Sequence, residues 1–218
     1  MTYEPVQSNL KRLRLLSAGA VASLAGLWLA MMVGGTGPLD RFVLGQLYSA
    51  HHPVLRAAAL FVTNFGEWPV VIGASLIAAI VLLLTNHRRS ALLLLGVTLL
   101  GRGLVEAQKF GIHRLRPEEY EHLVPVKSLS FPSAHAANSM ILYLSLATIA
   151  APPRHRRWAV PAALIGTFLV GISRPMLGVH WPSDVIGGWS FGAAWVLAML
   201  GLANRVAPAD STASVKPL

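Results

Sequence analysis

The sequence predicts an all-α fold, a polytopic bundle of six transmembrane helices, and three observations support this prediction. The first is composition: of 218 residues, 54% are hydrophobic and only 12% are charged, whereas a soluble domain of this size carries about 25% charged residues. The second is a series of long apolar runs. The third is that basic residues cluster in the short segments between these runs. The chain contains no cysteine, which excludes disulfides and thiolate metal sites.

Six apolar runs approach the length of a helical span, which needs about 20 mostly apolar residues. Five of them contain no charged residue: 15–39, 68–86, 136–153, 158–173 and 185–204. The third run in chain order, 90–108, contains Arg102 and Glu106, which are expected to pair on one helix face turned away from lipid. The apolar segment 42–66 holds two histidines, a proline and Arg56. It is therefore expected to be an interfacial helix and not a seventh span.

The runs define one domain. Residues 1–206 are predicted to form a single membrane domain, and the small polar residues 207–218 a disordered tail. The first run has the basic start and small residues of a signal peptide, but its length favours a retained span. Gly188 and Gly192 are expected to form a small-residue face that packs on another helix.

The basic residues predict the orientation, because they collect on the cytoplasmic side of membrane proteins. With the amino terminus inside, the inner side receives Lys11, Arg12, Arg14, Arg88, Arg89, Arg154, Arg156, Arg157, Arg205 and Lys216. The outer side receives Arg41, Arg56, Lys109, Arg114, Arg116, Lys127 and Arg174. The net charge of +9 would suggest nucleic acid in a soluble protein. Here the expected partners are the bilayer and an anionic substrate, because no basic-aromatic stretch resembles a nucleic-acid reader.

Three polar clusters fall at the outer ends of spans three to six. Their members in chain order are Lys109, Arg116 and Pro117; then Pro132, Ser133, Ala134 and His135; then Ser173, Arg174, His180 and Asp184. Catalysis of phosphoryl transfer is mainly positioning and electrostatic stabilisation. The cations suit the equatorial oxygens of a phosphoryl group, as do the hydroxyl of Ser133 and the amides at a helix start. One histidine would attack phosphorus and the other protonate the leaving oxygen. Asp184, four residues after His180, is expected to accept its ring N–H.

In order and spacing, these clusters resemble the three signature motifs of the type 2 phosphatidic acid phosphatases, also called lipid phosphate phosphatases. A lysine, six residues and Arg-Pro match Lys109, Arg116 and Pro117. Pro-Ser-Gly-His matches positions 132–135, with Ala134 in place of glycine. Ser-Arg, five residues, His, three residues and Asp match Ser173, Arg174, His180 and Asp184.

The resemblance implies an integral membrane enzyme that hydrolyses a phosphoric ester or diphosphate of a lipid through a phosphohistidine intermediate. His180 would be the nucleophile supported by Asp184, and His135 the general acid. Lys109, Arg116, Ser133, Arg174 and the amide of Ala134 would bind phosphate, without a metal or other cofactor. It also implies a bacterial cytoplasmic membrane, with the site facing the periplasm or the exterior. Ser173, Arg102 and Glu106 are candidates for supporting these groups from behind.

Several alternatives remain open at this stage. Phosphatidic acid, phosphatidylglycerophosphate, undecaprenyl diphosphate and lipid A phosphates all suit an outer-leaflet cationic site. A phosphotransferase on the same scaffold would use the same intermediate with a lipid acceptor in place of water. An anion transporter would more often carry internal repeats and mid-membrane polar groups, and the polar groups here lie at span ends. Either Ala134 is helical, or the local turn differs from the family's. The sequence does not predict an oligomeric state.

Overall fold

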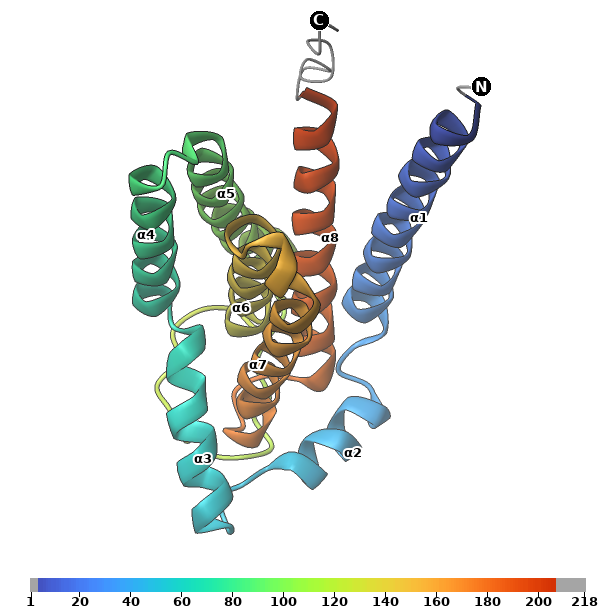
Figure 1. The fold of residues 1–218 in the computed structure, drawn as a ribbon. Helices are drawn as coiled ribbons and strands as arrows, with labels where there is room; N and C mark the ends of the chain where they lie inside the picture. The colour runs from blue at the N-terminus through green and yellow to red at the C-terminus, as the bar shows by residue number, and fades with distance from the viewer. Residues whose placement is uncertain (1–3, 207–218) are drawn as a thin grey trace, which may run out of the picture.

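A computed structural model describes residues 4–206, which form eight α-helices and three short 3-10 or π-helical turns (Figure 1). The α-helices are α1 (Glu4–Gly34), α2 (Pro38–Leu47), α3 (Pro53–Thr63), α4 (Trp68–Leu84), α5 (Arg88–Ile112), α6 (Ala134–Ser145), α7 (Arg156–Met176) and α8 (Pro182–Val206). The short turns are Asn64–Gly66, Leu146–Ala150 and Pro153–His155. The all-α prediction is therefore confirmed, and the predicted disordered tail lies outside the described residues.

Local sequence explains several helix boundaries near the outer motifs. Helices α2, α3 and α8 begin at Pro38, Pro53 and Pro182, where the missing N–H of proline costs nothing because first-turn amides lack a helical partner. Helix α5 ends at His113, which adopts a left-handed conformation with φ of 55°. This termination releases the chain one turn after Lys109 into the loop 113–133 that carries Arg116.

Helix α6 lies at the centre of the bundle and packs against α5, α7 and α8, while α1 packs along α8 (Figure 1). Two glycines permit the close approach of α8. A Cβ at Gly188 would lie 2.7 Å from the carbonyl oxygen of Ser133, and one at Gly192 would lie 2.9 Å from that of Ala137. The predicted small-residue packing face is therefore present, and it holds the first turns of α6 and α8 together.

The number of spans differs from the prediction of six. Four helical stretches, Leu15–Gly34, Arg88–Ile112, Pro153–Met176 and Pro182–Arg205, are each long and apolar enough to cross a membrane. A fifth candidate is the pair Pro53–Gly66 and Trp68–Leu84, which is bent by 48°. The fourth predicted span, 136–153, corresponds to Ala134–Ala150, which has only 17 residues, fewer than the roughly 20 that span a bilayer.

The boundaries of two predicted segments also change. The first apolar run was expected to extend to residue 39, but α1 ends at Gly34 and α2 begins four residues later. The segment 42–66, expected at the interface, contains α3 and a 3-10 turn that continue with a bend into α4. More than half of the predicted interfacial segment therefore belongs to the bent fifth candidate span.

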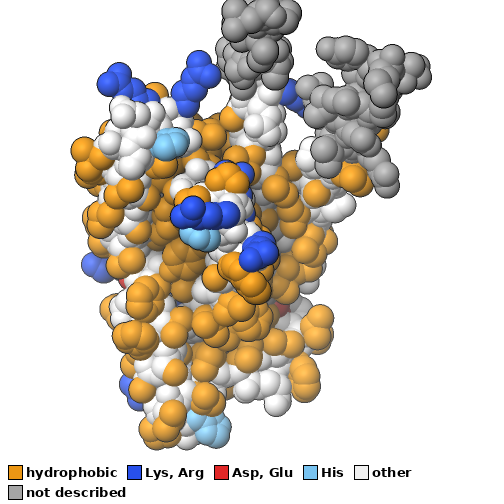
Figure 2. Space-filling view, in the orientation of Figure 1, with side chains coloured by type: hydrophobic (Ala, Val, Ile, Leu, Met, Phe, Trp, Pro, Cys, Tyr) orange, Lys and Arg blue, Asp and Glu red, His pale blue; other side chains and the backbone are white. Residues whose placement is uncertain are grey.

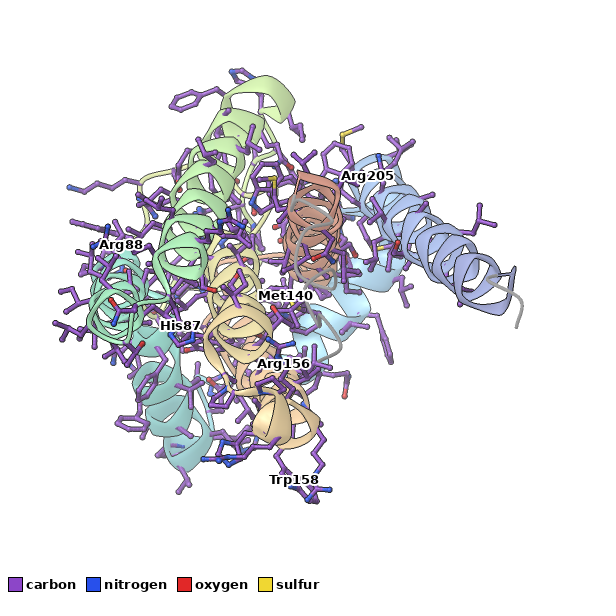
Figure 3. All side chains as sticks on the ribbon, turned by 45° about the horizontal axis from the view of Figure 1, so that its top comes forward. His87, Arg88, Met140, Arg156, Trp158 and Arg205 are labelled. Carbon is purple, nitrogen blue, oxygen red and sulfur yellow. The ribbon has the colours of Figure 1, made fainter. Side chains whose placement is uncertain are left out.

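The surface of the bundle is strongly apolar, as the space-filling view shows (Figure 2). Large side chains such as Leu84, Val33 and Leu92 are 71–78% exposed on three different helices. Exposed apolar area of this extent is typical of a surface that contacts lipid. Basic residues lie at one end: Figure 3 labels Arg88 at the start of α5, Arg156 at the start of α7 and Arg205 near the end of α8. The motifs lie at the opposite ends of these helices.

Candidate active site

A pocket of about 340 Å³ lies where the last turns of α5 and α7 meet the start of α6 and the turn before α8. Most of the residues singled out in the sequence line it: Lys109, Arg116, Ala134, His135, Arg174 and His180. Asp184 and Ser133 lie behind this lining, and both are completely buried. Helix packing thus brings the three motifs together at one end of the bundle, although they span 76 residues of sequence.

His180 lies beside Asp184 in the turn that leads into α8. Its Nδ1 is 3.3 Å from Oδ2 of Asp184, the pairing expected from their four-residue separation. The imidazole is buried, and burial, together with the nearby charge of Arg116, lowers the pKa of His180 well below its usual value. The ring is therefore neutral at neutral pH. With its Nδ1 proton directed at the carboxylate, Nε2 keeps a lone pair that can attack phosphorus.

Asp184 has three hydrogen-bonding partners in addition to His180. The hydroxyl of Ser130 donates to Oδ2 at 2.5 Å, and the backbone N–H of Trp181 donates to the same oxygen at 2.9 Å. The guanidinium of Arg114 binds the other oxygen, Oδ1, at 2.9 Å. A buried carboxylate needs such partners, because an unpaired charge in a low-dielectric interior is very costly. The orientation of Asp184, and with it that of His180, is therefore tightly determined.

Arg116 connects the nucleophile to the loop 113–133. Its Nη1 lies 3.1 Å from Nε2 of His180 and donates to the carbonyl oxygen of Val179 at 2.5 Å. Its Nε donates to the carbonyl oxygen of Ser128 at 2.7 Å. Burial lowers the pKa of Arg116 to about 10, so the guanidinium remains charged at neutral pH. A cation is thus fixed next to the atom that would attack.

The two other cations of the pocket, Lys109 and Arg174, are both buried. Lys109 donates from Nζ to the carbonyl oxygen of Leu129 at 2.6 Å, and Arg174 donates from Nη1 to the hydroxyl of Thr63 at 2.6 Å. Within residues 4–206, the Nε of Arg174 and the hydroxyl of Ser133 are buried polar atoms without a hydrogen-bond partner. Buried polar groups are normally paired, and the Nε of Arg174, a residue that lines the pocket, is therefore available to an anion there.

His135 is held differently from His180. Its Nε2 lies 3.2 Å from a carboxylate oxygen of Glu67, but without the geometry of a hydrogen bond. Ala134, immediately before it, is the first residue of α6. This position is helical, so glycine is not required, which resolves the question raised by the substitution. The first-turn amides of α6 keep their free N–H groups and the positive end of the helix dipole.

Three residues were expected to support the site from behind: Arg102, Glu106 and Ser173. Among the described residues, Arg102 and Glu106 form no ion pair. The guanidinium of Arg102 instead lies over the ring of Trp68, 5.7 Å from its centroid. An arginine preceding a glutamate is the weaker order for such pairs, and the aromatic face competes for the cation. Ser173 is buried, and its hydroxyl donates to the carbonyl oxygen of Val170 within α7.

Four residues that contact the site were missed in the sequence: Arg114, Ser130, Glu67 and Thr63. Arg114 would have been the easiest of them to predict, because it lies two residues before Arg116 and a buried Asp184 requires a counter-charge. It also donates to the carbonyl oxygens of Met31 and Met32 at 2.8 and 2.5 Å, which ties the site to the end of α1. Ser130 lies two residues before Pro132 of the second motif, whereas Glu67 and Thr63 lie on distant segments and carry no local signal.

No group of three or more histidine, aspartate or glutamate side chains suited to a metal ion occurs in the described part of the chain. The expectation that no metal is needed remains a prediction, because catalysis without one has to be measured.

A sequence model described as the PAP2 superfamily matches residues 90–207, more than half of the chain and all three motifs. The chain belongs to the PAP2 superfamily. The resemblance noted in the motifs is thereby confirmed, and the three clusters described above are the family's signature positions in this PAP2 protein.

Individual PAP2 proteins show the same relationship. The chain is 34% identical over 110 residues to the phosphatidylglycerophosphatase B of Bacillus subtilis, covering 48% of this chain and 54% of that protein. It is 29% identical over 147 residues to an undecaprenyl-diphosphatase of Sulfolobus acidocaldarius, covering 65% of this chain and 67% of that one. It is also 31% identical over 145 residues to the decaprenylphosphoryl-5-phosphoribose phosphatase of Mycobacterium tuberculosis, covering 65% and 76%. The match thus spans about half the length of the Bacillus enzyme.

A solved structure has the same fold. The crystal structure of a transmembrane PAP2-type phosphatidylglycerolphosphate phosphatase from Bacillus subtilis superposes with a TM-score of 0.79 at 26% identity. The superposition covers 85% of this chain and 96% of that one. The all-helical membrane bundle is therefore shared over nearly the whole chain, including helices outside the motifs.

Proposed function

We propose that the protein is an integral membrane lipid phosphatase that transfers a phosphoryl group to His180 and then to water. One observation carries this proposal: a buried, neutral histidine supported by Asp184 lies in a pocket with three fixed cations, Lys109, Arg116 and Arg174. A histidine without these cations would face an unneutralised phosphate, and the cations without a nucleophile would only bind it.

The two histidines divide the reaction. Nε2 of His180 attacks phosphorus and forms a P–N bond, while the bond from phosphorus to the leaving oxygen breaks. His135 gives a proton to that oxygen as it leaves. A water molecule then loses a proton to His135 and attacks the phosphohistidine, which breaks the P–N bond and releases inorganic phosphate. The three cations stabilise the charge on the equatorial oxygens in both steps.

An apolar cavity supports a lipid substrate. It has a volume of about 580 Å³ and lies between α3, α6 and α7, lined by residues such as Val62, Phe65 and Val170. Gly66 separates it from the site: a Cβ there would lie 2.5 Å from Val170 and 3.0 Å from the ring of His135. An acyl or prenyl chain in this cavity would place its phosphate near His135.

The orientation belongs to the same proposal. Because basic residues collect on the cytoplasmic side, the amino terminus and the basic turns before α5 and α7 lie in the cytoplasm, and the pocket at the opposite end faces the periplasm or the exterior. Cysteine labelling with an impermeant reagent in intact cells tests this. A cysteine at position 122 should react and one at position 155 should not, and the opposite pattern would reverse the orientation.

Phosphate release by the purified protein tests the activity. The panel contains phosphatidic acid, phosphatidylglycerophosphate, undecaprenyl diphosphate and a lipid A phosphate, the substrate types raised by the sequence and the relatives. We expect free phosphate from at least one lipid, unchanged by excess chelator, and inhibition by vanadate, which resembles five-coordinate phosphorus. Absence of phosphate release from every lipid, or activity that disappears with chelator and returns with magnesium, would contradict the proposal.

A further inference from the structure

The pocket carries more positive charge than one phosphate requires. A fourth cation, Lys127, lines it together with Lys109, Arg116 and Arg174, whereas Glu67 is the one carboxylate in the lining. Lys127 is exposed at the rim and forms no ion pair with any side chain of residues 4–206. Asp184 does not offset this excess, because it lies behind His180 and is paired with Arg114. With His180 neutral, the four cations and Glu67 give the lining a net charge of +3, and the proton that His135 carries as the proposed general acid adds to it.

Lys127 is also held close to the phosphate-binding cations. Its neighbour Ser128 accepts hydrogen bonds from Arg116 at its carbonyl oxygen, at 2.7 Å, and at its hydroxyl, at 3.2 Å. The next residue, Leu129, accepts from Lys109 at 2.6 Å. Arg116 and the buried Lys109 therefore anchor the backbone immediately after Lys127. Its ammonium moves only on its own flexible stem, from a fixed point at the pocket mouth.

We infer that Lys127 binds a second phosphate and that the pocket prefers lipid diphosphates to lipid monophosphates, an inference that rests on the proposed function. A phosphomonoester carries a charge of about −1.5 to −2 at neutral pH, and Lys109, Arg116 and Arg174 together with Glu67 already match it. A diphosphate adds a phosphate, with further charge on its far side. The phosphate under attack lies at His180 in the interior, so the one that stays on the lipid lies toward the rim, where Lys127 is free.

The reaction on such a substrate is balanced by the groups already described. Nε2 of His180 bonds to the terminal phosphorus, and the bond from this phosphorus to the bridging oxygen breaks. The electron pair leaves with the lipid monophosphate. Water then releases the terminal phosphate from His180. A lipid monophosphate is a better leaving group than a lipid alkoxide, so the step on a diphosphate depends less on the proton from His135.

Two substrates with one tail test the inference: farnesyl diphosphate and farnesyl phosphate, with kcat/KM measured for phosphate release. Wild type should prefer the diphosphate. Lys127→Gln should lower kcat/KM for the diphosphate by about tenfold, equivalent to about 1.4 kcal/mol, and by less than about threefold for the monophosphate. Lys127→Arg should retain the preference. Arg56→Gln removes an exposed cation of α3 that lies outside the pocket lining, and should leave the ratio unchanged.

The outcomes separate this inference from the proposed function. Equal loss on both substrates in Lys127→Gln, or no loss on either, overturns the inference while lipid phosphatase activity stands. If Arg56→Gln lowered the ratio of kcat/KM for the diphosphate to that for the monophosphate as much as Lys127→Gln does, the effect would come from the overall positive charge of the protein. That result would also overturn the inference. Absence of phosphate release from either lipid by wild type, combined with inactivity on the wider lipid panel, would remove the proposed function itself.

Inhibition by inorganic pyrophosphate is a second measure of the same inference. Pyrophosphate should inhibit wild type more strongly than phosphate does, and Lys127→Gln should remove this difference.

Discussion

The two histidines of the pocket are held in opposite ways. His180 is buried and lies within 3.4 Å of Asp184, Ser130 and Arg116. His135 is near one partner, Glu67, whose side chain is 45% exposed, and its Nε2 makes no hydrogen bond within the described residues. The ring of His180 is therefore fixed by several contacts, whereas that of His135 is fixed by fewer.

The difference matches the two tasks proposed for the histidines. A nucleophile must approach phosphorus along one line, so it benefits from neighbours that fix its ring and tautomer. A residue that first gives a proton to the leaving oxygen and then takes one from water must serve two positions. Freedom at Nε2 of His135 permits this. The contrast predicts that substitutions at or around His180 reduce activity more than substitutions around His135.

The largest effect is expected for His180→Ala. Without the nucleophile no phosphohistidine forms, so turnover should fall by at least roughly 10⁴-fold on every substrate. Lipid phosphate release and p-nitrophenyl phosphate hydrolysis measure it. His52→Ala, which changes an exposed histidine far from the motifs in the sequence, is the control and should keep wild-type rates. Turnover of p-nitrophenyl phosphate by His180→Ala, with His135→Ala inactive on it, would reverse the two assignments.

His135→Ala should have an effect that depends on the leaving group. A lipid alkoxide leaves poorly without a proton, so the rate on a lipid monophosphate should fall by roughly 10²–10⁴-fold. A p-nitrophenolate leaves readily, and its rate should fall much less. Parallel assays of the two substrates measure the difference. Equal losses would mean that His135 does not act as the general acid.

The same variant offers a direct view of the intermediate. With p-nitrophenyl phosphate, attack by His180 continues while the base that activates water is missing, so a phosphoenzyme should accumulate in His135→Ala. Brief exposure to labelled substrate followed by denaturation should capture an acid-labile adduct. Its loss in the His180→Ala, His135→Ala double variant would assign the adduct to His180.

Arg114→Gln tests how far the support of Asp184 matters. The change leaves a buried carboxylate without its charged partner, which costs about 3–5 kcal/mol in comparable pairs. We expect a lower melting temperature and a kcat reduced by roughly tenfold or more, with little change in KM, because Arg114 does not line the pocket. Arg114→Lys should recover part of both. An unchanged kcat in a destabilised protein would limit Arg114 to a structural role.

Glu67→Gln should have the smallest effect. The carboxylate is half exposed and its contact with His135 lacks hydrogen-bond geometry, and ion pairs open to solvent contribute about 0–1 kcal/mol. The rate on a lipid monophosphate should therefore fall by less than about fivefold. A pH–rate profile would show whether its acidic or basic limb moves. A loss as large as that of His135→Ala would mean that His135 is as firmly held as His180.

The sequence permitted much of the site to be predicted because the motifs are local. Lys109 and Arg116 are seven residues apart across the end of one helix, and His180 and Asp184 share one turn, so spacing alone indicated that His180 pairs with Asp184. The helices were predictable because uncharged runs mark them. The span count was not, because α6 with its π-helical turn is short and α3 bends into α4.

What the sequence by itself determined is thus the set of candidate reacting groups, since each motif contains its polar residues within a short stretch. Only the tertiary structure decided which distant groups support them. Arg114 contacts Asp184 across 70 residues, Arg174 contacts Thr63 across 111, and Glu67 contacts His135. The physical reason is that a buried charge accepts any partner that packing brings within reach. The pairing of Arg102 with Trp68 in place of Glu106 has the same origin: a neighbouring helix offered a better contact than the next turn.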